Sequence, residues 1–194
     1  MKPKTTQFLA NAASWWLFAL AGTGFLLVKK RNMFSYGKNS EANLQGVNET
    51  LVKVMRRALY LSEDDFSIVD GLRTEAEGRA NLASGASQAA RSTHLDGLSV
   101  DIHAVESSPG VYVRIARAVA KAAEEMGVQI RWGGAWEVLS TRTDPGFMLR
   151  QYEAKKRLTG GKPFEDLGHF ELFPKSMLNG RWVYTPKGGK NGNA

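Results

Sequence analysis

The spacing of apolar and polar residues predicts helices in four segments of the chain. Residues 47–61 carry apolar side chains at spacings of three and four, with basic residues on the opposite side, which is typical of an amphipathic helix. Residues 109–127 show the same apolar spacing. This segment starts with a proline and ends with a glycine, residues that commonly begin and end helices. Residues 74–85 begin with capping-box spacing and end at a glycine, which also favours a helix. Residues 147–158 are expected to form the fourth.

Short apolar runs bounded by turn residues predict strands at residues 66–69, 99–105, 128–132 and 168–173. The segment "GGAW", which follows the third of these runs, is expected to turn. Because the helices and strands interleave without a strict β-α-β repeat, the pattern predicts the α+β class.

An uncharged segment precedes the predicted domain. Residues 5–28 contain no charged side chain, and residues 12–28 are nearly all apolar, which is long enough to span a bilayer as a helix. A cleaved signal peptide, a retained signal-anchor and a buried core helix are all compatible with this pattern. A membrane anchor or export signal is favoured, with membrane contact through residues 12–28.

The distribution of charge argues against a nucleic-acid partner. The net charge is +7, but residues 1–34 hold five basic residues and no acid, and residues 175–194 hold four basic residues and no acid. A nucleic-acid-binding domain carries its basic patch on the folded body. We therefore expect three parts: a hydrophobic segment, 1–33, a folded domain, 34–174, and a basic C-terminal tail, 175–194.

The chain has no cysteine and three histidines, so a metal would have to be held by histidine and carboxylate side chains. His94 stands seven residues before Asp101, and a turn at Gly97 would bring the two together. His103 shares the expected strand face with Asp101 and is a less favoured alternative ligand. His169 would supply a second imidazole.

The segment "EDLGHFEL" offers two carboxylates beside His169. Glu171 shares its face on a strand, and Asp166 reaches that face if the chain bends at Gly168. A metal hydrolase needs one carboxylate to take a proton from water and pass it to the leaving amine. Geometry alone leaves Asp166 and Glu171 both open.

Arg73 stands at the end of the first predicted strand, in "DGLRT". It could bind a substrate carboxylate through a bidentate contact. An ion pair with Asp70 or Glu77 is an equally good interpretation.

Two motifs together resemble a known family of zinc peptidases. The first, SxHxxGxxxD, comprises Ser92, His94, Gly97 and Asp101, and the second, DxxHFEL, comprises Asp166 and His169. The family includes phage L-alanyl-D-glutamate endolysins and D-alanyl-D-alanine carboxypeptidases and dipeptidases. The resemblance extends over residues 34–173 and includes "GLRT", "SGASQ" and "RWGGAW".

The resemblance implies a Zn²⁺ ion held by His94, Asp101 and His169. It also implies that Asp166 is the catalytic carboxylate, because the family's stands three residues before its last histidine. Glu171 is then left a supporting structural role. With the predicted elements, this gives a small antiparallel sheet flanked by helices around a central zinc site, preceded by an N-terminal hydrophobic helix.

The remaining expected site residues also follow from the resemblance. Arg73 corresponds to the family's arginine ahead of the first ligand and would polarise or anchor the scissile region. Trp136 is expected to shape the floor of the site, and Gln88 and Ser92 to bind substrate. Residues 137–165 are longer than expected for the endolysin branch and could form a lid or a wall-binding feature.

The expected activity is cleavage of the L-alanyl-D-glutamate bond in peptidoglycan stem peptides, for host cell lysis by a monomeric enzyme. A D-alanyl-D-alanine carboxypeptidase and a non-catalytic wall-binding module of the same fold are the alternatives. A signal-anchor would place the protein in the host inner membrane or periplasm. Without an anchor it would stay cytoplasmic until release.

Overall fold

A computed structural model describes residues 17–20, 25–28, 33–85 and 91–186 of the protein. The chain forms two compact units, residues 1–32 and 33–194. Leu17–Leu20 (β1) and Phe25–Val28 (β2) of the first unit pair as antiparallel strands.

The predicted N-terminal hydrophobic helix is therefore wrong for these eight residues, and the rest of residues 12–28 lies outside the described part of the chain. Two glycines lower the helix propensity of the segment, and its aromatic residues are compatible with strands. No helix within the described ranges is long and apolar enough to cross a membrane, so the predicted membrane contact finds no support there.

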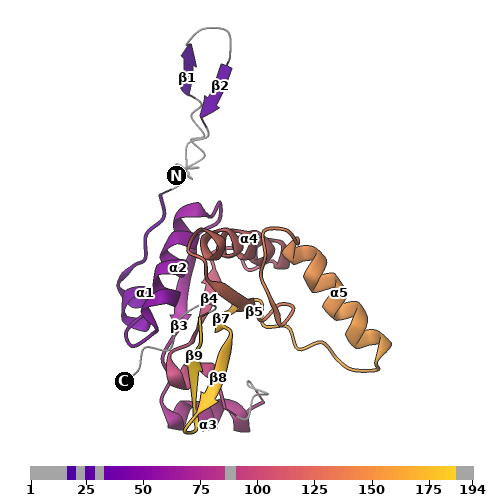
Figure 1. The fold of residues 1–194 in the computed structure, drawn as a ribbon. Coiled ribbons are helices and arrows are strands. Elements are labelled where there is room, and N and C mark those ends of the chain that lie inside the picture. Colours follow the sequence, from indigo (N-terminus) through magenta and orange to yellow (C-terminus); the bar gives the residue numbers. More distant parts are fainter. Residues whose placement is uncertain (1–16, 21–24, 29–32, 86–90, 187–194) are drawn as a thin grey trace, which may run out of the picture. The chain divides into compact units, whose positions relative to one another are not determined.

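In the second unit, five strands form one antiparallel sheet in the order β3-β4-β7-β5-β6 (Figure 1). They are Phe66–Asp70 (β3), Ser99–Ala104 (β4), Gln129–Trp132 (β5), Glu137–Val138 (β6) and His169–Phe173 (β7). The α+β class and the antiparallel sheet are thus confirmed. The two-residue β6 is too short to give a sequence pattern.

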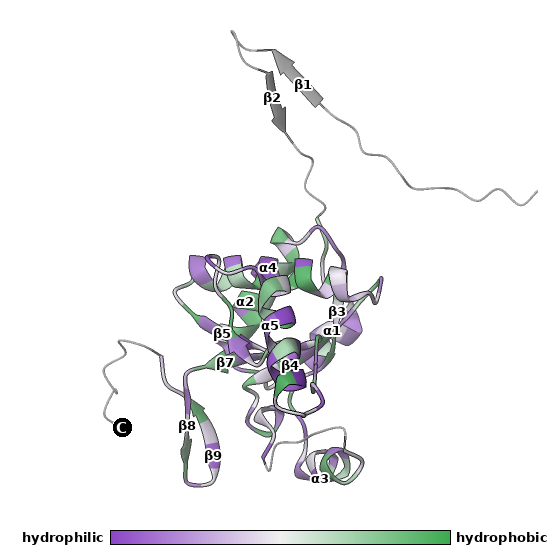
Figure 2. Ribbon diagram, turned by 90° about the vertical axis from the view of Figure 1, so that its right-hand side faces the viewer, coloured by the Kyte–Doolittle hydropathy of each residue, from purple (hydrophilic) through white to green (hydrophobic). Residues whose placement is uncertain are grey.

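The helices are Lys38–Asn43 (α1), Glu49–Leu61 (α2), Glu75–Ala83 (α3), Pro109–Glu125 (α4) and Pro145–Leu158 (α5), with a 3₁₀ turn at Thr93–Asp96 (η1). The four predicted helices are present, and only the short α1 was not expected. The Thr74 side chain caps α3 in a complete capping box with Glu77. Figure 2 shows hydrophobic and hydrophilic residues alternating along α4, as expected for an amphipathic helix.

The two faces of the sheet differ because successive side chains of a strand point to opposite sides. One face is apolar and packs with residues of α2 and α4 in a single core; it includes Val100, Ile102, Ile130, Trp132, Phe170 and Leu172. The opposite face carries a polar row formed by Ser99, Asp101, Arg131, His169 and Glu171. The helices therefore cover one face and leave the polar face for a site.

The predicted C-terminal tail, residues 175–194, is folded over residues 175–184. Lys175–Leu178 (β8) and Arg181–Tyr184 (β9) form an antiparallel hairpin, which lies at the same end of this unit as α3 (Figure 1). The backbone N–H of Trp182 donates to Asp96 at 2.8 Å, and its indole N–H donates to the Arg91 carbonyl at 3.1 Å. These bonds attach the hairpin to the segment that carries His94.

Candidate metal centre and active site

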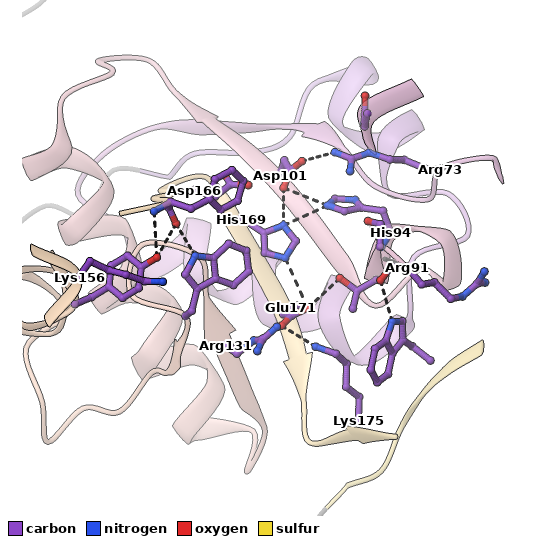
Figure 3. A pocket seen from close by; sticks show the side chains of 17 residues that line it. Arg73, Arg91, His94, Asp101, Arg131, Lys156, Asp166, His169, Glu171 and Lys175 are labelled. Atoms are coloured by element: carbon purple, nitrogen blue, oxygen red, sulfur yellow. Dashed lines mark hydrogen bonds and ion pairs between the residues drawn. The ribbon is translucent and has the colours of Figure 1, made fainter. Parts of the chain in front are cut away.

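Three ligand atoms converge at the centre of the polar face (Figure 3). Asp101 on β4 and His169 on β7 are directly opposite each other in the sheet. The Oδ1 atom of Asp101 lies 2.9 Å from His169 Nδ1 and 3.2 Å from His94 Nε2, and the two nitrogens are 3.3 Å apart. This cluster could hold a metal ion.

The turn that carries His94 forms as the glycine spacing indicates. Ser92 caps η1 by accepting a bond from the backbone of His94, and Gly97 ends it with a φ of 65°. A Cβ at Gly97 would lie 2.5 Å from the carbonyl oxygen of Gly46. Gly97 is therefore needed both for its left-handed backbone and for close packing, and the turn directs His94 back to β4.

Each cluster histidine is oriented through its second ring nitrogen. His94 Nδ1 lies 2.7 Å from the Gly71 carbonyl oxygen, and His169 Nε2 lies 3.7 Å from Glu171 Oε2. An acceptor on the outer nitrogen fixes the tautomer and directs the inner lone pair to a metal. Two oriented imidazoles and one carboxylate form a donor set typical of catalytic zinc, which leaves a position for water.

The electrostatics of the cluster favour a cation at its centre. Burial would raise the pKa of Asp101, but its hydrogen bonds with His169 and His94 outweigh burial and hold the pKa well below the usual range. Burial lowers the pKa of His169, but its bonds with Asp101 and Glu171 raise the pKa to about 9. A positive charge, whether a proton or a metal ion, is thus stabilised where the ligand atoms meet.

Glu171 is a buried carboxylate with four partners. It accepts from Thr93 Oγ1 at 2.9 Å, from Lys175 Nζ at 2.7 Å and from Arg131 Nε, and it faces His169. Burial alone would raise its pKa, but the bond and charge of His169 and the charge of Lys175 hold the pKa well below the usual range. Glu171 is therefore ionised, although its side chain is only 2% exposed.

Asp166 lines the same pocket as the three candidate ligands. It is positioned by its own backbone, whose N–H donates to the Gly133 carbonyl at 3.1 Å and whose carbonyl accepts from the N–H of His169 at 3.1 Å. A Cβ at Gly133 would lie 2.5 Å from the Asp166 carbonyl oxygen. Burial raises the pKa of Asp166 above its usual value, although the charge of His169 opposes this.

Arg73 pairs with two carboxylates, one of which is a candidate ligand. Its Nε donates to Asp70 and its terminal N–H to Asp101 Oδ2, both at 2.6 Å. An irregularity in β3 between Ile68 and Asp70 places Asp70 opposite Asp101. The predicted pairing with Asp70 is therefore present, whereas Glu77 is engaged in the cap of α3.

The pocket around the cluster has a volume of about 600 Å³, within the range of small-molecule sites. Trp136 is one of the residues that line it, with its ring centroid 5.6 Å from that of His169 and 6.0 Å from that of Phe164. Its φ of 55° is rare for a bulky residue, and its indole N–H donates to the Phe164 carbonyl at 2.6 Å. Tyr152 and Lys156 show that residues 137–165 contribute a wall of this pocket.

Two predicted site residues lie elsewhere or outside the described chain. His103 is exposed and pairs with Ser107 Oγ at 3.1 Å, and it is not part of the cluster. Gln88 falls outside the described residues. Ser92 lines the pocket in addition to capping η1.

Sequence reasoning missed several residues that line the pocket: Arg91, Thr93, Arg131, Tyr152, Lys156, Phe164, Lys175 and Trp182. The signal for Arg131 is its place in "VQIRW", where alternation puts a charged side chain on the face opposite Ile130 and Trp132. The signal for Lys175 and Trp182 is the hairpin sequence that contains them.

Comparisons with known proteins identify the family of this chain. A family model described as phage L-alanyl-D-glutamate peptidase matches residues 32–148. The L-alanyl-D-glutamate peptidase of Escherichia phage T5 is 36% identical over 112 residues, which cover 53% of this chain and 82% of the phage protein. The crystal structure of the Serratia marcescens L-Ala D-Glu endopeptidase ChiX matches with a TM-score of 0.55 and 34% identity, over 72% of this chain and 90% of that one. The chain therefore belongs to the phage L-alanyl-D-glutamate peptidase family.

Proposed function

We propose that the protein is a zinc-dependent peptidoglycan hydrolase of the endolysin type, which cleaves the bond between L-alanine and D-glutamate in stem peptides. The observation that carries this proposal is the convergence of His94 Nε2, Asp101 Oδ1 and His169 Nδ1 in one pocket with Asp166. Two similar proteins named for cleavage at L-alanyl-D-glutamate support the choice of bond.

Zinc would be held by His94, Asp101 and His169. When bound, it would lower the pKa of a water molecule and polarise the carbonyl of the scissile peptide bond. The other oxygen of Asp101 is held by Arg73. We infer that Arg73 acts by fixing Asp101 as a ligand, since two carboxylates already balance its charge.

Asp166 would move the proton. Its raised pKa, caused mainly by burial, makes it a better base than an exposed aspartate and still allows it to release the proton. It would accept a proton from the attacking water and donate it to the amine of D-glutamate as that amine leaves. Trp136, which contacts His169, would form the apolar base on which the substrate backbone lies.

Substitution of Glu171 should weaken zinc binding. In Glu171→Gln the acceptor of His169 Nε2 is no longer charged, and we expect zinc affinity to fall about 10- to 100-fold, the usual effect of removing the partner of a ligand. Competition with a chromophoric chelator measures this, and thermal unfolding should also show lower stability because Lys175 and Arg131 lose their anion. A zinc affinity within twofold of wild type would show that Glu171 does not orient His169.

A defined muropeptide distinguishes cleavage between L-alanine and D-glutamate from the two alternative functions, a carboxypeptidase and a wall-binding module. The full chain loaded with zinc is incubated with a disaccharide pentapeptide ending in D-alanyl-D-alanine, and the products are identified by mass spectrometry. We expect disaccharide–L-alanine and a tetrapeptide with an amino-terminal D-glutamate. Free D-alanine would instead indicate a carboxypeptidase. No cleavage by the zinc-bound protein would indicate a wall-binding module.

A further inference from the structure

Five basic side chains line the pocket, and they differ in how far neighbouring acids balance them. These side chains are Arg73, Arg91, Arg131, Lys156 and Lys175. Arg73 is paired with Asp70 and Asp101. Arg91 is likewise paired with two acids, Asp96 and Glu75. Neither of these arginines brings an excess positive charge to the pocket.

On the β5 side of the cluster, positively charged side chains outnumber the carboxylates that pair with them. Arg131 and Lys175 share one carboxylate, that of Glu171. Two cations on one anion leave a net positive charge beside His169, since Glu171 also faces that ring. Lys156 has no acidic partner among the described residues, but its ammonium lies 5.6 Å from the centroid of the Tyr152 ring on α5.

Arg131 is held at two points and keeps its outer donors available. Its Nε donates to Glu171, and its guanidinium carbon lies 5.4 Å from the centroid of the Trp136 ring. Within the described residues its terminal N–H groups have no hydrogen-bond partner, and the side chain is 31% exposed. A guanidinium fixed in this way presents a planar pair of donors, which matches a carboxylate better than an ammonium does.

The free carboxylates of a stem peptide all lie on one side of the proposed cut. The carboxyl of L-alanine is in the scissile bond, whereas D-glutamate keeps its α-carboxylate and the diamino acid after it can carry another. We propose that the Arg131 guanidinium binds a carboxylate on the leaving-group side of the stem peptide and thereby sets the preference among peptidoglycan types. This inference rests on the proposed function and deepens it.

The test compares matched substrates in matched variants of the full, zinc-loaded chain. One pair of stem peptides has D-glutamate or D-isoglutamine at the second position, and the other has meso-diaminopimelate or lysine at the third. For each variant, the ratio of kcat/KM within a pair is measured, so a general loss of activity cancels. The variants are Arg131→Gln, Arg131→Lys and, as a control among the pocket cations, Lys156→Gln.

We expect wild type to prefer the carboxylate member of at least one pair by roughly 10- to 100-fold, as charge-assisted hydrogen bonds give. Arg131→Gln should bring that ratio close to one, Arg131→Lys should leave it in between, and Lys156→Gln should keep it. The pair that responds identifies which carboxylate Arg131 binds.

Two results would overturn the inference about Arg131 while leaving the proposed function intact. One is equal rates for both members of both pairs in wild type, and the other is a preference that survives Arg131→Gln. A preference abolished by Lys156→Gln but not by Arg131→Gln would assign the role to Lys156 and overturn it as well. If wild type cuts none of the peptides between L-alanine and D-glutamate, the proposed function itself fails.

Discussion

Asp166→Asn is expected to lower kcat by about 10²- to 10⁴-fold, the usual contribution of a general acid–base, while the protein keeps its zinc. Asparagine preserves the shape of the side chain and the turn to His169, which is made by the backbone. It can neither accept the proton of the attacking water nor deliver one to the leaving amine. Turnover of a defined muropeptide and zinc content per chain are measured on the same preparation.

The neighbouring acid supplies the control. Glu165 stands one residue earlier and is exposed, so Glu165→Gln makes the same chemical change without touching the pocket, and its kcat should match wild type. If Asp166→Asn retained near-normal turnover with zinc bound, the proton would have to move through another group, and our assignment of Asp166 would be wrong.

His169→Ala is expected to weaken zinc binding by more than about 100-fold, beyond the range found for residues that only support a ligand, and to abolish hydrolysis. The substitution removes one of three ligand atoms and leaves Asp101 Oδ1 and Glu171 Oε2 without their shared partner. Zinc titration against a competing chelator measures the first effect, and muropeptide turnover measures the second.

His103→Ala is the matched variant for this experiment. His103 lies on the same strand as Asp101 but is exposed and outside the cluster, so zinc affinity and turnover should stay at wild-type values. Equal zinc affinity in the two histidine variants would mean that the metal binds elsewhere.

Much of the fold could be read from the sequence because its elements carry strong local signals. The capping box of α3, the proline and glycine that bound α4 and the alternation along β4 each depend on residues close together in the chain. The turn at Gly97 is equally local, and it explains why His94 and Asp101 could be paired from spacing alone. His169 comes close to Asp101 because of the register between β4 and β7. The sequence pattern could not predict this register, so His169 was assigned to the ligand set through the family resemblance.

Two misses have different causes. The β8–β9 hairpin had a recognisable signal, because Asn179 and Gly180 form a two-residue turn with φ values of 48° and 74°, and Asn-Gly is a strong hairpin sequence. The basic composition of the tail obscured it. The ion pair of Arg131 with Glu171 has no local sequence signal, because Glu171 lies 40 residues away. The two residues are brought together only by the pairing of β5 with β7.

We propose that the His94–Asp101–His169 cluster holds a zinc ion, and that cleavage between L-alanine and D-glutamate depends on this ion. The most direct measurement is the appearance of amino-terminal D-glutamate in purified peptidoglycan treated with the zinc-loaded chain, the chelated chain and the chelated chain resupplied with zinc. We predict new ends with the first, none with the second and recovery with the third. Release of the same ends by the fully chelated chain, or no release by the zinc-loaded chain, would contradict the account.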